Sequence, residues 1–340
     1  MTQTAAGLPG LVGPATPRRP VSPAVAASLA LGLAAAGLAL RLFHADRVPW
    51  LATLLLLFSS LLIQAFPFVL LGALASAAIE VFVPGSALAR FGRLPRRLQL
   101  PVAGVSGLAF PVCECGSVPV ARRLAARGVS AGAAVTFMLA APIVNPIVIV
   151  STAVAYRGRT TALLMVLGRI GLGFAAAIAM GWAVGIRSPR ELLKALPDDD
   201  AGPDRHGRTA RAFFEHFAAD AVFMGGHLVV GAAAAATLQT FVPESVMSSV
   251  AGTYGVDVVA MMALAGVLSL CSESDAFVAA SFVQFGPAPQ LAFLVFGPLM
   301  NLKLASLYVG TFRRGFLAAV LLVAAGVTLA GTLWIEALVR

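Results

Sequence analysis

The chain has 340 residues, of which 59% are hydrophobic and 11% are charged, and its mean hydropathy is +0.91. These values exclude a soluble domain, because too few polar residues are present to cover its surface, and they predict an all-α polytopic membrane protein. The net charge of +9 does not indicate nucleic-acid binding, since most arginines sit in short links between apolar runs, where they orient helices in a bilayer.

The N-terminal part is predicted to hold a cytoplasmic tail, residues 1–22, and a leading transmembrane helix within residues 23–48. Arg18 and Arg19 before the apolar run 23–43 also resemble the start of a signal peptide. No small-residue cleavage site with a soluble domain follows, so a first spanning helix is expected.

Six further apolar runs are each near or above the ~20 residues that a helical span needs. They are residues 52–82, 131–156, 160–186, 216–242, 289–310 and 315–337. The run 52–82 is overlong and contains Pro67, so we expect it to bend there or to extend past the bilayer.

Two other apolar pieces, 98–112 and 256–270, are too short to span at ~1.5 Å per residue. The first runs into Cys113-Glu114-Cys115 and the second into Cys271-Ser272-Glu273-Ser274-Asp275. All three cysteines of the chain therefore follow a short apolar piece.

An internal repeat connects the two halves. The stretch 72-GALASAAIEVFVP-84 aligns without a gap with 231-GAAAAATLQTFVP-243, and 137-FMLAAPIVNPIVIV-150 aligns with 293-FLVFGPLMNLKLAS-306. Two repeats are therefore predicted, at 49–186 and 216–340, joined by a cytoplasmic linker at 187–215.

Loop charge indicates that the repeats are inverted. Short cytoplasmic loops collect arginine, and arginines follow both the Phe-Val-Pro and the cysteine motif of the first repeat, those after the cysteine motif being Arg122, Arg123 and Arg127. The equivalent loops of the second repeat carry no basic residue. Opposite orientation requires that each repeat crosses the membrane an odd number of times. This condition holds if each short apolar piece forms a re-entrant or broken-helix hairpin. Arg157 and Arg159 would then lie outside, against the rule, and a parallel arrangement with full spans is the alternative. With inversion, the two hairpin tips meet in a central polar site.

The candidate site residues lie at these tips or within apolar spans. Thiols are soft ligands, and the predicted metal ligands are Cys113, Cys115 and Cys271. The alternatives for a membrane cysteine are a small apolar side chain that fills space and a structural disulfide. A carboxylate at the bilayer centre costs roughly 2.5–3.5 kcal/mol, which favours a role in transport over chance. The acidic candidates are Glu114, Glu273 and Asp275, with Ser272 between them.

Two cations and two amides complete the set. Arg169 and Lys303 are natural partners for the carboxylates, with snorkelling toward a helix end as the alternative. Asn145 and Asn301 lie beside prolines, where a broken helix could line the site, and interhelical hydrogen bonding is the alternative.

Four motifs together carry a resemblance to a known family. They are P-x-C-x-C-G-x-x-P, A-P-I-V-N-P, C-S-E-S-D-A-F-V-A-A-S-F and F-G-P-L-M-N-L-K. The chain resembles, from about residue 50 to its end, the predicted-permease family that includes ArsP-type trivalent organoarsenical efflux permeases. The resemblance implies a secondary permease without an ATPase domain, with its motifs at Cys113, Cys115, Ser272, Glu273 and Asp275.

Glu114 departs from this pattern, because a small residue such as serine is expected between the paired cysteines. A carboxylate between two thiols moves the site toward cations such as Cu(I) or Zn(II), and away from a neutral organoarsenical.

The sequence thus predicts a multi-pass cell-membrane permease and not an enzyme, without a cofactor other than the metal or metalloid that it carries. It would export a thiophilic species, coupled to protons through the carboxylates. Its partners would be the lipid bilayer and a small inorganic or organometalloid substrate, with no nucleic acid; a homo-oligomer or a partner subunit is left open. One alternative is a transmembrane thiol–disulfide electron carrier, in which Cys113 or Cys115 pairs reversibly with Cys271. Another is a non-transporting subunit of a larger complex.

Overall fold

The computed structural model describes residues 49–339 except 93, 111, 186–188, 195–208 and 242–254. The predicted tail 1–22, the leading segment 23–48 and most of the linker 187–215 lie outside the described residues. Within the described part the elements are helices, together with an isolated bridge between Leu193 and Phe312. The all-α prediction is therefore confirmed.

Within the described residues, six helical stretches are long and apolar enough to cross a membrane. They are α2 (Pro49–Phe82), α6 with α7 (Ala131–Val144 and Pro146–Ala155), α8 (Ala162–Val184), α10 (Ala210–Phe241), α14 with α15 (Pro287–Leu299 and Leu302–Thr311) and α16 (Phe316–Val339). They correspond to the six runs predicted after the leading segment. Helix α2 continues through Pro67 for 34 residues, which is the predicted extension beyond the length of one span.

Shorter helices lie between these stretches. They are α3 (Gly85–Gly92), α4 (Arg96–Val105), the 3-10 turn η2 (Ser106–Leu108), α5 (Glu114–Ala126), α9 (Pro189–Leu192), α12 (Val256–Leu268) and α13 (Asp275–Ser281). Both cysteine motifs lie at a break between two short helices. That each pair of short helices enters and leaves a membrane on one side stays a prediction.

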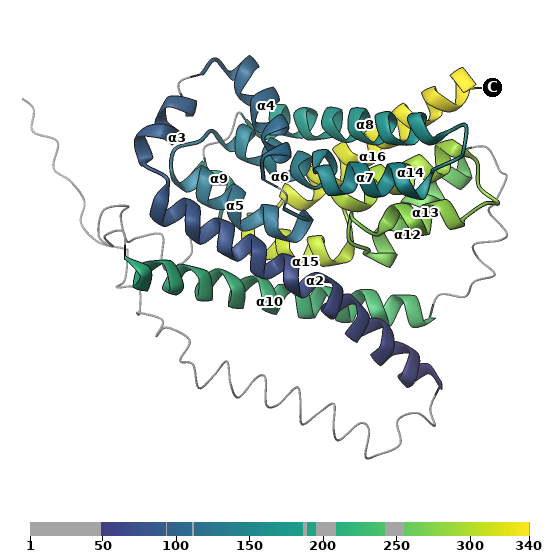
Figure 1. The fold of residues 1–340 in the computed structure, drawn as a ribbon, viewed down its shortest axis with the longest axis horizontal. Coiled ribbons are helices and arrows are strands. Elements are labelled where there is room, and N and C mark those ends of the chain that lie inside the picture. The colour runs from purple at the N-terminus through teal and green to yellow at the C-terminus, as the bar shows by residue number, and fades with distance from the viewer. Residues whose placement is uncertain are drawn as a thin grey trace, which may run out of the picture.

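The order of elements recurs in the two halves. Helices α2, α4–α5, α6–α7 and α8 are followed by α10, α12–α13, α14–α15 and α16. The matching helices α2 and α10 pack along each other in opposite directions (Figure 1). At one end the ring centroids of Trp50 and Phe241 are 6.2 Å apart, and at the other end those of Phe82 and Phe213 are 5.9 Å apart. Antiparallel packing is what inverted repeats require, and inversion itself stays a prediction.

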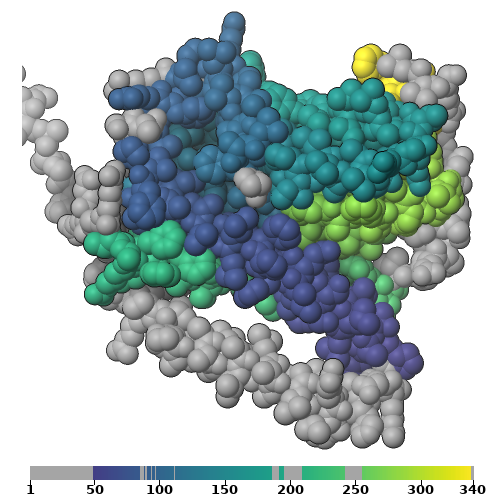
Figure 2. All heavy atoms as spheres, viewed as in Figure 1, coloured from purple at the N-terminus to yellow at the C-terminus, as the bar shows by residue number. Residues whose placement is uncertain are grey.

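The centre of the bundle is formed by the broken helices α6 and α14. Every residue of α6 is buried, whereas the outer helices expose large apolar side chains such as Ile63 (73%), Leu163 (68%) and Leu322 (72%). Figure 2 shows one such outer face, with α2 in purple beside the teal helices of the first half. Exposed apolar side chains of this kind are expected on a surface in contact with lipid.

Candidate functional site

The two cysteine-bearing helix breaks meet inside the bundle. The hydroxyl of Ser272 donates a hydrogen bond to Oε2 of Glu114 at 2.9 Å, although the two residues are 158 positions apart. Glu114, Ser272 and the three cysteines are all buried. We call residues 112–117 and 269–275 together the tip site.

The first-half tip is fixed by the start of helix α5. Cys113 is the N-cap residue of this helix and Glu114 is its first residue. A Cβ atom on Gly72 of α2 would overlap Cα of Gly116, so only two glycines allow this close approach. On the other side, the Ser117 hydroxyl donates to the carbonyl oxygen of Met138 at 2.9 Å. The start of α5 is therefore held between α2 and α6.

The three predicted metal ligands are present as free, buried thiols. Cys113 and Cys115 lie at the start of helix α5, and the ammonium of Lys303 lies 3.7 Å from Sγ of Cys271. In the part of the chain that the structure describes, no group of three or more His, Cys, Asp or Glu side chains is arranged to hold a metal ion. The thiols share one site without forming a closed coordination cage.

Arg169 of helix α8 binds the second-half tip. Its Nη2 atom lies 2.7 Å from Oδ2 of Asp275 and 3.0 Å from the carbonyl oxygen of Ser272, and Nη1 donates to Oγ1 of Thr152 at 2.9 Å. The sequence indicated Arg169 as a carboxylate partner but gave no signal for Thr152. The guanidinium thus fixes the tip through a side chain and a backbone group.

Several buried carboxylate oxygens at the tip site have no hydrogen-bond partner among the residues that the structure describes. They are Oε1 of Glu114, both oxygens of Glu273 and Oδ1 of Asp275. An unsatisfied buried polar atom is destabilising, so native proteins keep such atoms mainly where a proton, an ion or a water molecule completes them. These oxygens are available to a proton or to a cation.

Asn145 and Asn301 both cap the second part of a broken helix. The Oδ1 atom of Asn145 accepts from the amide of Ile147 at 2.9 Å, and that of Asn301 accepts from Leu304 at 2.9 Å. The predicted helix breaks are confirmed, and the observed contacts of both side chains are structural. Asn301 lies two residues before Lys303, so its cap fixes the backbone that carries this cation.

A second charged cluster joins α2, α5 and α10, and it was not identified from the sequence. Arg123 lies 3.6 Å from Asp220 and 3.7 Å from Glu80, and the Ser76 hydroxyl donates to Asp220 at 2.6 Å. Arg123 belongs to α5 and is buried, whereas loop-charge counting placed it in a cytoplasmic loop. The available signal was the presence of Glu80 and Asp220 inside apolar spans.

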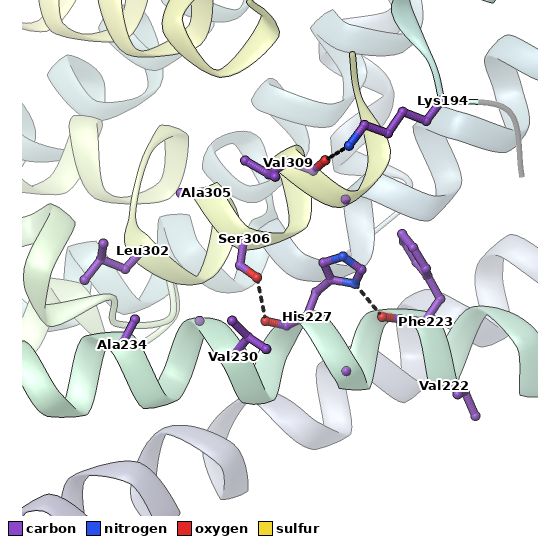
Figure 3. Close-up of a pocket in the computed structure, with 13 residues that line it drawn as sticks. Lys194, Val222, Phe223, His227, Val230, Ala234, Leu302, Ala305, Ser306 and Val309 are labelled. Atoms are coloured by element: carbon purple, nitrogen blue, oxygen red, sulfur yellow. Dashed lines mark hydrogen bonds between the residues drawn. The ribbon is translucent and has the colours of Figure 1, made fainter. Parts of the chain in front are cut away.

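An open groove of about 890 Å³ runs between α10 and α15 (Figure 3). Its lining is mostly apolar. The ring nitrogen Nδ1 of His227 lies 2.9 Å from the carbonyl oxygen of Phe223, and the hydroxyl of Ser306 donates to the carbonyl oxygen of His227 at 3.0 Å. None of the predicted site residues lines the groove, so it is separate from the tip site.

Comparison with known proteins places the chain among permeases. Residues 50–335 match the family model ArsP_1, described as a predicted permease. The UPF0718 protein YcgR of Bacillus subtilis (strain 168) is 36% identical over 290 residues, which cover 82% of this chain and 96% of that protein. A Streptococcus mutans protein, whose name describes a two-component membrane permease complex subunit, is 32% identical over 267 residues, 77% of this chain and 88% of that protein. No solved structure matches the chain.

Proposed function

Because the chain belongs to the ArsP_1 family of predicted permeases, we propose that it is a secondary permease of the cell membrane that exports a thiophilic metal or metalloid species through the tip site. The observation that carries this proposal is the hydrogen bond between Ser272 and Glu114, because it brings the thiols and carboxylates of both halves into one buried place.

The chemistry of the proposed site divides between two kinds of group. Cys113, Cys115 and Cys271 act as transient soft ligands for the cargo. The carboxylates of Glu114, Glu273 and Asp275, each with an oxygen that has no partner among the described residues, take up protons in exchange for it. A transport site must bind weakly enough to release its cargo, so thiols without a closed four-ligand cage suit this task better than a structural metal centre.

Glu114 sets the proposed preference among thiophilic species. A buried carboxylate beside two thiols favours a cation, such as Cu(I) or Zn(II), over a neutral trivalent arsenical. We therefore rank methylarsenite below the two cations.

Alternating access follows from the proposed inverted repeats, with each cysteine-bearing pair of short helices as a re-entrant hairpin and the N-terminus in the cytoplasm. The antiparallel packing of α2 and α10 supports this arrangement. The name of the Streptococcus mutans relative supports the further proposal that this chain works with a partner subunit.

The electron-carrier alternative receives less support. It needs a reversible disulfide between Cys271 and a first-half cysteine, and it gives no role to the buried carboxylates of Glu114 and Glu273. It also gives no role to the ion pair between Arg169 and Asp275.

Flux into everted membrane vesicles tests the proposal. Methylarsenite, Cu(I) and Zn(II) are compared with and without a proton gradient, using the intact protein, Cys113→Ser and Glu114→Gln. Glu215→Gln on the exposed end of α10 is the matched charge control. We expect uptake of one cation that needs Cys113 and Glu114, collapses with the gradient and survives the control substitution. Uptake of none of the three species, together with a reducible bond between Cys271 and a first-half cysteine, would favour the electron carrier.

A further inference from the structure

Two buried cations contact the tip site, and they are held very differently. Arg169 and Lys303 are each only 1% exposed. Arg169 has three oxygen acceptors at 2.7–3.0 Å. Among the described residues, the Lys303 ammonium donates to the sulfur of Cys271, at 3.7 Å. One cation is locked in place, and the other is held loosely.

Lys303 lies beside the part of the tip site that we propose to bind the cargo. An ammonium has three donors, and its partner, the thiol of Cys271, is a weak acceptor. Cys271 directly precedes Ser272, whose hydroxyl donates to Glu114, so the ammonium lies next to the contact between the two halves. A positive charge at this place offsets negative charge on the carboxylates and thiols of the site.

The backbone at Lys303 is fixed, so only the side chain is able to leave. A Cβ atom on Gly231 of α10 would come within 2.6 Å of Cα of Lys303. One residue earlier, the amide of Leu302 donates to Oγ of Ser269 at 3.1 Å. A flexible four-carbon stem on a rigid backbone lets the charge move while α15 stays in place.

We propose that Lys303 is a built-in cation that occupies the charge position of the cargo and is displaced when a cationic cargo binds. This inference rests on the proposed function and adds to it the residue that competes with a cationic cargo for the site. A cargo cation bound at Cys271 and Glu114 lies close to the ammonium, and like charges repel strongly in a medium of low dielectric constant. Return of the lysine then drives release, so the site does not retain its cargo.

The test is equilibrium binding of Ag(I), a redox-stable soft cation, to the purified full chain in detergent, with flux measured in parallel. Removal of the like charge in Lys303→Met should tighten Ag(I) binding by about tenfold or more, the size of effect that a charge within ~4–6 Å has on an ionisation equilibrium. Flux should fall at the same time, because release becomes slow. Lys303→Arg keeps the charge and should bind Ag(I) as the intact protein does.

Lys194→Met is the matched control, because Lys194 lies outside the tip site and donates to the backbone of Val309 at the far end of α15. It should change neither Ag(I) affinity nor flux.

Equal or weaker Ag(I) binding by Lys303→Met would overturn the inference, since loss of a merely structural cation does not strengthen binding. Lys303→Gln provides a second neutral variant, and failure of both neutral variants to fold would also overturn it. If the intact protein neither binds nor transports Ag(I), Cu(I), Zn(II) or methylarsenite, the proposed function fails instead.

Discussion

The two helix breaks of the tip site occupy matching places in the two halves, yet they carry different chemistry. The first-half break supplies two thiols and Glu114 at the start of α5, and close backbone contacts at Gly116 hold it. The second-half break supplies one thiol, hydroxyl groups and the carboxylate of Glu273 in the non-helical residues 269–274, and the ion pair of Arg169 with Asp275, the first residue of α13, holds it. Both halves thus contribute thiols and charges, but two of the three thiols come from the first half and most of the carboxylates come from the second.

The largest expected effect comes from breaking the support of the second-half break. Arg169→Met leaves Asp275 as an unpaired buried charge, which should destabilise the protein by about 3–5 kcal/mol. Thermal unfolding in detergent measures this loss. The double variant Arg169→Met, Asp275→Leu should regain part of it, and equal loss in both variants would show that the ion pair does not explain the effect.

The support of the first-half break should be sensitive to volume rather than to charge. Gly72→Ala places a methyl group against Cα of Gly116 and should cost about 1–3 kcal/mol by overpacking. Gly171→Ala on α8 is the control, because a Cβ atom there meets nothing within 4 Å. Equal thermal stability of the two variants would contradict the close approach of α2 and α5.

The thiols of the first half should matter for transport much more than for stability. Cys113→Ser replaces a soft ligand with a hard one of similar size, so cargo flux should fall about tenfold or more, equivalent to roughly 1.4 kcal/mol. The unfolding temperature should change little. Unchanged flux of the thiophilic cargo, measured in vesicles, would remove Cys113 from the site.

Sequence reasoning found the elements of this comparison but not their contacts. Long apolar runs located the six spanning stretches, since length and hydropathy decide them. Prolines beside Asn145 and Asn301 signalled the helix breaks. Arg169 was predicted to pair with one of the acidic candidates, and the three-dimensional structure shows that this partner is Asp275.

Other contacts had no signal that a single sequence could provide. The hydrogen bond between Glu114 and Ser272 depends on how two distant helix breaks pack. Arg123 was misplaced in a loop because counting loop charges does not show whether a short helix buries them. The approach of Gly72 to Gly116 depends on the crossing of α2 and α5, which composition does not determine.

The most direct test of the claim that both halves form one site is a double-mutant cycle on cargo flux with Glu114→Gln and Ser272→Ala. The two side chains share one hydrogen bond, and residues in contact typically show coupling energies of about 0.5–3 kcal/mol. A single site predicts that the double variant transports about as well as the poorer single variant. Losses that simply multiply would mean that the two breaks act independently, and would contradict the account.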